Sequence, residues 1–320
     1  MNGILEKVKQ STKYVVENSK EVKINQKNLK RIAKIIKTKK PPKPDKELFS
    51  GIPENELVQF LFVLDSLNFC FWPEKGKKKW KVFYKKKYFS GFFAFALALK
   101  KAFFKYPILD SNYLQSISLS DLKNIFKGQG EIPLLKERQK IIQQNARILN
   151  IKYKGRAEHI LEKSNRDVEK FIETLIKDFP SFQDTAFYKG KKIYFLKRAQ
   201  ILAVDIYEVL KEKGLKSFKN QDKLTCFADY RIPQILNNFG VLEYSKKLTE
   251  KIKNKKLIPK FSKEEIEIRA NCIWAVEYIK EELKQARKSF CSYEIDEILW
   301  GMSKKLKLKI PHHRTKTIYY

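Results

Sequence analysis

Apolar residues recur at intervals of three and four along most of this chain. That spacing places them on one face of an α-helix, and an apolar face must be buried against another element. Residues 54–72 contain a dense apolar helix, and a further helix is expected to begin near Lys197. The same pattern occurs in residues 5–18, 26–36, 134–149, 166–178, 244–253, 263–284 and 295–305. The sequence therefore predicts a mainly α fold.

Two segments alternate instead with a period of two, which is typical of a β-strand with one buried face. Residues 79–93 (KWKVFYKKKYFSGFF) alternate around a lysine-rich turn, and residues 186–196 (AFYKGKKIYFL) alternate around Gly190. We expect two short β-hairpins. The last residues, IPHHRTKTIYY, are expected to pack as a strand or as an extended arm across the body.

A charged, proline-interrupted connector, residues 37–47 (KTKKPPKPDKE), follows the second predicted helix. Its prolines prevent it from being helical throughout. We interpret it as an exposed loop inside one domain rather than as a boundary between two. With 43% hydrophobic residues, the 320-residue chain can bury a substantial core, and we expect residues 1–320 to form a single helical domain.

The net charge of +32 normally suggests nucleic acid or an anionic surface as a partner. Here the positive charge is mostly lysine and is spread along the whole chain, whereas phosphate and base recognition favours the arginine fork. We therefore interpret most of it as a solvated surface and expect no direct nucleic-acid binding. A small substrate that carries a phosphate would still be attracted.

The four cysteines are scattered, without a CxxC pair, and the chain has three histidines. A zinc site is therefore not expected, and this cysteine usage is typical of a reducing cytoplasm. Residues 1–10 mix charged and apolar residues, so we expect no signal peptide. The most apolar stretches, residues 58–72 and 91–99, are too short or too interrupted to span a bilayer, which predicts a soluble protein.

No P-loop, dinucleotide-binding glycine pattern, GxSxG or HExxH motif occurs in the chain. Acid–base chemistry would therefore fall to carboxylates, tyrosines or lysines. Three carboxylates have strongly aromatic neighbours: Asp65 (FVLDSLNFCFW), Asp229 (CFADYR) and Asp296 (SYEIDEILW). Each could instead be a helix cap or a hydrogen-bonding group at the edge of the core.

Asp229 is the most informative of the three, because it stands between Phe227 and Tyr230 and just before Arg231. Rings around a carboxylate perturb its proton affinity, and a flat ring face beside it can stack a planar ligand. That combination suits a site that holds a heterocyclic base while positive charge develops on an attached sugar. The alternative is a helix N-cap, since an apolar helical run follows directly.

Several segments together resemble the queuosine salvage proteins, the queuosine 5′-phosphate N-glycosylase/hydrolases. The match runs in order over nearly the whole chain, from residue 5 to residue 320, so the resemblance is more specific than any single motif. They are VLDSLNFCFWP, YFSGFFAF, IPLLKERQKII, FPSFQDTAFYKGKKIYFLKRAQILAVD, FADYRIPQIL, EEIEIRANCIWAVE and PHHRTKTIYY.

The resemblance implies hydrolysis of the N-glycosidic bond of queuosine 5′-monophosphate. The released base, the 7-deazaguanine queuine, becomes available for re-insertion into tRNA. It also implies a single helical domain related to DNA glycosylases, with no metal and no organic cofactor.

The resemblance also assigns residues. It places Phe227 and Asp229 at the base and ribose, and Asp296 and Trp300 at the ligand through the motif of the last helix. The chain departs from some relatives in two places, because KELFSG (residues 46–51) lacks an upstream histidine and GMSKK (residues 301–305) lacks an acidic residue. The contacts to the cyclopentene-diol arm of queuine are the part of the site that these departures affect.

Breaking a ribosyl–base bond creates positive charge on the sugar, which a carboxylate below the anomeric carbon stabilises. We assign this catalytic role to Asp229. Asp296 is expected to pair with the secondary ammonium of the ligand, and Lys197 and Arg231 are the candidate cations for the 5′-phosphate.

Two alternatives remain open at this point. One is a non-catalytic tRNA- or nucleic-acid-binding protein, which the charge and the aromatic residues suggest. The other is a DNA-repair glycosylase, although no helix-hairpin-helix glycine signature is present.

Overall fold

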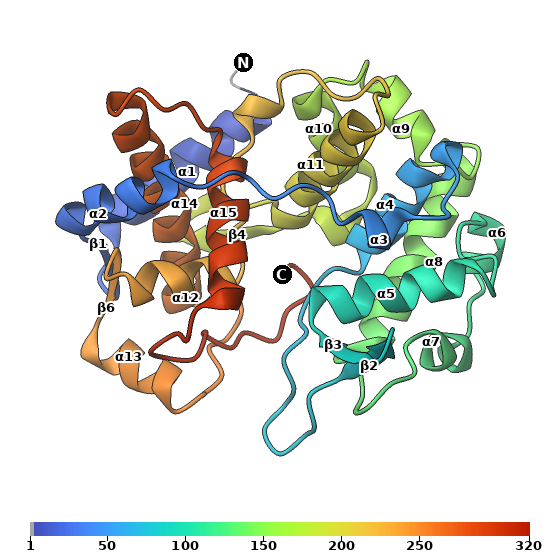
Figure 1. Cartoon of the computed structure of the whole chain (residues 1–320), viewed down its shortest axis with the longest axis horizontal. Coiled ribbons are helices and arrows are strands. Elements are labelled where there is room, and N and C mark those ends of the chain that lie inside the picture. The colour runs from blue at the N-terminus through green and yellow to red at the C-terminus, as the bar shows by residue number, and fades with distance from the viewer. Residues whose placement is uncertain (1–2) are drawn as a thin grey trace.

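The structure is a computed structural model that describes residues 3–320, and it is mainly helical (Figure 1). The α-helices in this part of the chain are α1 (Ile4–Asn18), α2 (Gln26–Lys37), α3 (Lys46–Phe49), α4 (Leu57–Ser66), α5 (Phe92–Phe103), α6 (Ser111–Leu114), α7 (Leu119–Ile125), α8 (Leu135–Lys152), α9 (Glu158–Lys163), α10 (Val168–Asp178), α11 (Lys197–Glu212), α12 (Arg231–Asn238), α13 (Lys246–Lys253), α14 (Lys263–Gln285) and α15 (Ser292–Lys305). The strands are β1 (Val22–Ile24), β2 (Lys81–Tyr84), β3 (Lys87–Ser90), β4 (Thr185–Tyr188), β5 (Lys191–Tyr194) and β6 (Leu242–Tyr244).

The mainly α prediction is confirmed, and the periodic segments coincide with helices. The stripe of residues 134–149 is α8, that of 263–284 is α14, and the helix expected near Lys197 begins there as α11. Some boundaries differ by two or three residues: α15 begins at Ser292 instead of residue 295, α8 continues to Lys152, and α13 begins at Lys246 because Tyr244 belongs to β6. Ser245 caps α13 by accepting a hydrogen bond from the backbone of Leu248, so the helix can begin only after it.

Both predicted hairpins are present, as the antiparallel pairs β2–β3 and β4–β5. A third two-stranded sheet, β1–β6, was not expected from the sequence. It pairs Val22 with Tyr244 and Ile24 with Leu242. Strands of three residues more than two hundred positions apart leave no local signal, whereas a hairpin is specified by its own turn.

The connector of residues 37–47 is largely exposed, as expected, and its last two residues open α3. It crosses the front of the molecule from α2 to α3 in Figure 1, passing α15 on the way. Lys43 and Lys46 form ion pairs with Glu212 at the end of α11, at 3.0 and 3.6 Å. The connector is therefore attached to the body at this point.

The first helix and the C-terminal tail are both packed into the body. Helix α1 lies against α14, and β1 pairs with β6. The tail runs as the extended arm that the sequence predicted, and Tyr320 is buried. Its backbone carbonyl accepts a hydrogen bond of 3.0 Å from the backbone N–H of Cys70. No helix within residues 3–320 is both long and apolar enough to cross a membrane.

Candidate active site

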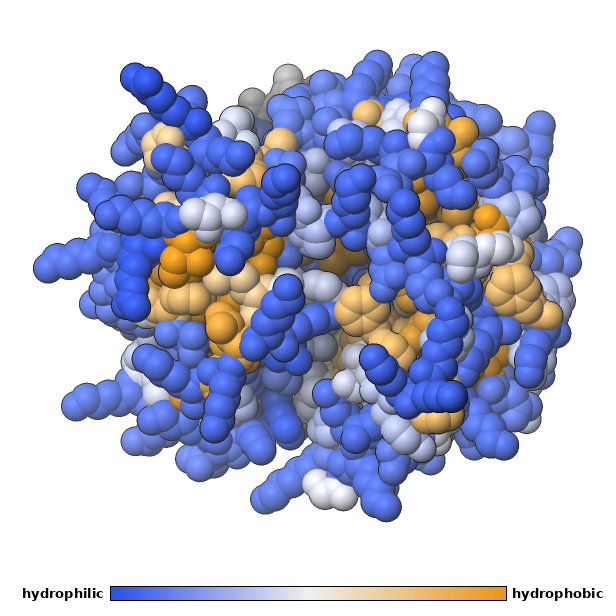
Figure 2. All heavy atoms as spheres, in the orientation of Figure 1, coloured by the Kyte–Doolittle hydropathy of each residue, from blue (hydrophilic) through white to orange (hydrophobic). Residues whose placement is uncertain are grey.

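A cavity of about 600 Å³ lies between the helices of the C-terminal part and the segment around α4 and α5. All six residues predicted for the site contribute to its wall: Lys197, Phe227, Asp229, Arg231, Asp296 and Trp300. Aromatic rings form much of the rest: Phe49, Phe69, Phe71, Trp72, Phe92, Phe93, Tyr230 and Tyr320. Figure 2 shows hydrophilic side chains over most of the front face and apolar atoms inside a hollow near its middle. A volume of this size can hold one nucleotide-sized ligand.

Asp229 caps α12 and also lines the cavity. Its Oδ1 accepts hydrogen bonds from the backbone N–H groups of Arg231 (2.6 Å) and Ile232 (3.0 Å), at the first turn of α12. The carboxylate therefore satisfies two donors at the helix N-terminus, as a cap does. Its Oδ2 accepts no hydrogen bond from the described residues and belongs to the cavity wall. The helix fixes one oxygen and leaves the other available to a ligand.

The loop before Asp229 is fixed by Asp296 from α15. Oδ2 of Asp296 accepts hydrogen bonds from the backbone N–H of Phe227 at 2.9 Å and from the thiol of Cys226 at 3.1 Å. Burial raises the pKa of Asp296 to about 8, and the nearby charge of Asp229 contributes to the rise. Asp296 thus positions the ring of Phe227 and also places a carboxyl group in the cavity.

A buried arginine, Arg269 of α14, connects several segments around the site. Its guanidinium donates to both oxygens of Asp184, at 2.9 and 2.5 Å, and to the carbonyl of Ala228 at 3.1 Å. Asp184 in turn accepts a hydrogen bond of 3.1 Å from the backbone N–H of Lys197. Arg269 also lies over the ring of Tyr320. One side chain therefore holds together the residue next to Asp229, the start of α11 and the tail.

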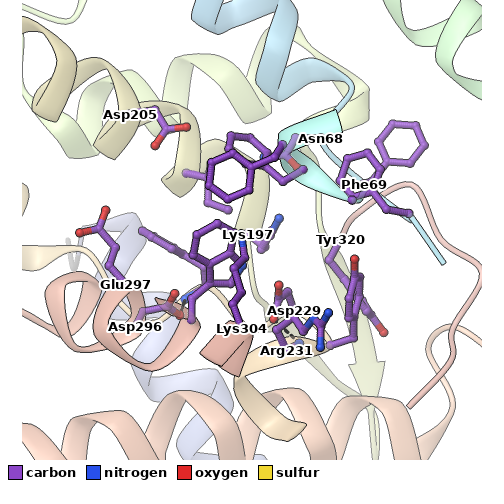
Figure 3. A pocket seen from close by; sticks show the side chains of 18 of the residues that line it. Asn68, Phe69, Lys197, Asp205, Asp229, Arg231, Asp296, Glu297, Lys304 and Tyr320 are labelled. Atoms are coloured by element: carbon purple, nitrogen blue, oxygen red, sulfur yellow. Dashed lines mark hydrogen bonds between the residues drawn. The ribbon is translucent and has the colours of Figure 1, made fainter. Parts of the chain in front are cut away.

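One end of the cavity is acidic, which the sequence did not predict. Asp205 from α11 faces Asp296 and Glu297 from α15 across it (Figure 3), and Glu208 of α11 also lines the cavity close to Glu297. Burial raises the pKa of Glu297 to about 9, and Glu208 adds to the effect. Burial also raises the pKa of Asp205 well above its ordinary value, with a further contribution from the neighbouring Asp65. Carboxyl groups so close together favour a cationic ligand group, whose charge would stabilise their ionised forms.

The opposite end is cationic. Lys79, Arg231, Lys304 and Arg314 line it, and Arg231 and Lys304 lie beside Asp229 in Figure 3. The Nε of Arg314 is buried and has no hydrogen-bond partner among residues 3–320. A buried donor without an acceptor is costly, so this nitrogen is suited to an anion.

Two other residues of the cavity wall, His312 and Lys197, differ from what their types suggest. His312 lines the cavity beside Tyr230, but burial lowers its pKa to about 4, so it is neutral at pH 7. Lys197 lies near Asp229 and Asp65, away from the cluster around Arg231. Burial lowers the pKa of Lys197, whereas the negative charges of these two carboxylates raise it. Of the two predicted phosphate-binding cations, Arg231 is therefore better placed.

Trp300 closes the aromatic wall between α15 and α5. Its ring packs against those of Phe92 and Phe93, with centroids 6.2 and 5.8 Å away. The side-chain nitrogen of Lys304, one turn later on α15, lies over the Trp300 ring, and burial lowers the pKa of Lys304 to about 7, with the charge of Arg231 adding to the effect. Within residues 3–320, no group of three or more His, Cys, Asp or Glu residues is arranged to hold a metal ion.

Comparison with known proteins shows the family of this chain. The family model described as queuosine salvage protein matches residues 50–320, which is most of the chain. The chain belongs to the queuosine salvage protein family. It is 35% identical to the queuosine 5′-phosphate N-glycosylase/hydrolase of Sphaerobacter thermophilus, over 97% of this chain and 96% of that protein. The proteins of the same name from Bos taurus and Schizosaccharomyces pombe are 32% and 31% identical, over 99% or more of each chain.

In this queuosine salvage protein, the site residues that the sequence missed are mainly acidic and come from helices. Asp205, Glu208 and Glu297 lie on helices whose apolar stripes we interpreted only as core-facing. A signal was available for Glu297, because it follows Asp296 directly in an aromatic setting. Arg314 and His312 come from the tail, which we interpreted as an arm and not as a wall of the site.

Proposed function

We propose that this protein hydrolyses the N-glycosidic bond of queuosine 5′-monophosphate and releases queuine for salvage into tRNA. The observation that carries the proposal is the polarity of the cavity. Carboxyl groups line one end and cations line the other, with aromatic rings between them. Asp229 lies between the two ends, since its charge raises the pKa of Asp296 on one side and that of Lys304 on the other.

Each part of the proposed substrate has a matching part of the cavity. The 5′-phosphate fits the cationic end, where Arg231 and Arg314 offer guanidinium groups and the Arg314 Nε lacks an acceptor. The secondary ammonium on the base fits the acidic end, where it would pair with Asp296. The flat 7-deazaguanine fits between the rings of Phe227 and Trp300. Ordinary nucleotides carry no positive charge there, so the acidic end would select queuine over guanine.

The free oxygen of Asp229 supplies the chemistry. As the ribosyl–base bond breaks, positive charge develops on the anomeric carbon, and a fixed carboxylate stabilises it without reorganisation. The same oxygen can take a proton from the attacking water, which gives ribose 5-phosphate and the free base. Two backbone donors of α12 hold the other oxygen in place. Lys197, near Asp229, has an ammonium group that can orient the carboxylate and the ribose hydroxyls.

The leaving group explains why the carboxylate is central. A 7-deazaguanine lacks the N7 lone pair that purine hydrolases protonate to assist departure of the base. The reaction therefore depends more on stabilising the sugar cation than on protonating the base.

We place this reaction in the cytoplasm, as the scattered cysteines predict.

The test is to incubate the purified protein with queuosine 5′-monophosphate and to detect free queuine by mass spectrometry. We expect release by the wild type and at least a 100-fold lower kcat for Asp229→Asn, the scale of losing one electrostatic contact to the transition state. Ligand binding should be largely kept, because Asn can still accept the two α12 hydrogen bonds. A near-normal kcat in this variant would remove Asp229 from the mechanism. No release by folded wild-type protein would refute the proposed function.

A further inference from the structure

The β2–β3 hairpin carries a surface feature that the proposed reaction does not use. Phe83 and Tyr88 are direct cross-strand partners, with ring centroids 5.0 Å apart. They are 53% and 60% exposed, although aromatic rings elsewhere in this protein mostly form the core. An exposed pair of touching rings is costly in water, and such pairs commonly mark a binding surface.

This aromatic pair lies in the most basic part of the chain. Residues 75–87 contain eight lysines and no acidic residue. Lys85 is paired with Glu47 and Lys79 lines the cavity, but Lys75, Lys77, Lys78, Lys86 and Lys87 are exposed and have no ion pair among the described residues. We refer to Phe83, Tyr88 and the lysines of residues 75–87 as the hairpin strip.

The hairpin strip adjoins the mouth of the cavity. Lys81 pairs with Ser90, on the same face of the hairpin as Phe83 and Tyr88, and Ser90 lines the cavity. The two cross-strand pairs are therefore about 7 Å apart along the strands. A chain of nucleotides passing the cationic end of the cavity would next meet the aromatic pair.

We propose that the hairpin strip binds single-stranded RNA. Base stacking on exposed rings beside a basic track is how proteins hold single strands without reading their sequence. An anionic membrane would also attract lysines and rings, but the continuity with a cavity shaped for a nucleotide favours a nucleotide chain. The sequence argument against nucleic acid concerned the dispersed lysine charge, whereas here charge and stacking rings occur together.

The test uses the full-length protein and a fluorescein-labelled 12-nucleotide oligouridine, with binding measured by fluorescence anisotropy. This probe contains no queuosine, so a failure here is independent of the proposed hydrolysis. With about four phosphates contacted, affinity should fall about 50-fold between 50 and 200 mM salt. The Phe83→Ser/Tyr88→Ser double variant should bind at least about 10-fold more weakly, since each stacked base contributes about 1–3 kcal/mol.

Two matched controls separate the hairpin strip from general adsorption. Phe187 is 70% exposed on the other hairpin, among lysines but without an exposed aromatic partner, so Phe187→Ser should bind RNA like the wild type. Lys78→Gln/Lys87→Gln should weaken binding more than Lys246→Gln/Lys247→Gln on α13, where both lysines are also exposed. None of these residues lines the cavity, so cleavage of the mononucleotide should be unchanged in every variant.

Three results would overturn the proposal. One is wild-type affinity in the Phe83→Ser/Tyr88→Ser variant, which would mean that RNA adsorbs through charge alone. Another is an equal loss in the α13 lysine variant, which would mean that the whole surface contributes. The third is binding to phosphatidylserine vesicles without binding to oligouridine, which would assign the hairpin strip to a membrane surface.

Discussion

Replacing Arg269 by methionine should be among the most damaging single changes in this protein. Arg269 is fully buried, and it pairs with Asp184, which is 2% exposed. It also lies 3.4 Å from a carboxylate oxygen of Glu265. Methionine fills much of the same space but leaves the Asp184 carboxylate buried without its partner. Breaking a buried ion pair in this way costs about 3–5 kcal/mol of unfolding free energy.

The assay is guanidinium denaturation followed by tryptophan fluorescence, with thermal melting alongside. A cost of that size should lower Tm by about 4–8 °C in a chain of this length. The matched control is Arg147→Met on α8, an exposed arginine that should change stability by no more than about 0.5 kcal/mol. Because Arg269 also holds the carbonyl next to Asp229, kcat should fall at temperatures where the variant is still folded.

A second variant tests the electrostatic reasoning itself. In Arg269→Met/Asp184→Asn, the unpaired carboxylate is gone, and the new amide oxygen can still accept from the backbone N–H of Lys197. This double variant should be more stable than Arg269→Met by about 1–2 kcal/mol, because an unpaired buried charge costs more than a neutral amide. A loss below 1 kcal/mol for Arg269→Met, or no recovery in the double variant, would refute this account of the pair.

Two further predictions concern the acidic end of the cavity. Glu297 has a pKa of about 9 in the folded protein and an ordinary pKa in the unfolded chain. Between about pH 5 and pH 9 its carboxyl group is therefore protonated in the folded protein but ionised in the unfolded chain. The free energy of unfolding consequently falls as the pH rises through this range. Glu297→Gln should remove this effect, and its stabilisation in urea melts should be about 3 kcal/mol greater at pH 8.5 than at pH 6; an equal gain at both values would contradict it. Asp296 has a pKa of about 8, so it should release up to one proton when it pairs with the ammonium group of queuine at pH 7. This proton release can be measured by titration calorimetry in two buffers of different ionisation enthalpy. Asp296→Asn should abolish this release and weaken queuine binding about 10- to 100-fold, whereas unchanged affinity would refute the pairing.

The local part of the fold could be predicted from the sequence, because it depends on short-range patterns. Apolar spacing located α8 and α14 almost to the residue, and the turn at Gly190 located the second hairpin. The β1–β6 sheet could not be predicted, since its strands are three residues long and its pairing depends on how distant helices pack.

The site was predictable where one segment carries the chemistry and not where several segments share it. The segment around Asp229 contains its own aromatic neighbours and its own helix start, so its importance was visible in the sequence. Asp205 became a site residue only because α11 meets α15 across the cavity, a contact that no local pattern specifies. The cap interpretation and the functional interpretation of Asp229 were not exclusive, because a carboxylate has two oxygens.

The packing of α1 against α14 has a consequence for the time course of synthesis. About 245 residues separate the end of one helix from the start of the other. At 5–20 residues per second, α1 leaves the ribosome about 10–50 s before its partner does. During that interval its apolar face, with Leu5, Val8 and Val15, can pack only against earlier elements such as α10 and β5 and lacks its contact with α14. The core around α1 is therefore completed late, and the cavity, which Tyr320 helps to line, is complete only once that residue has been added.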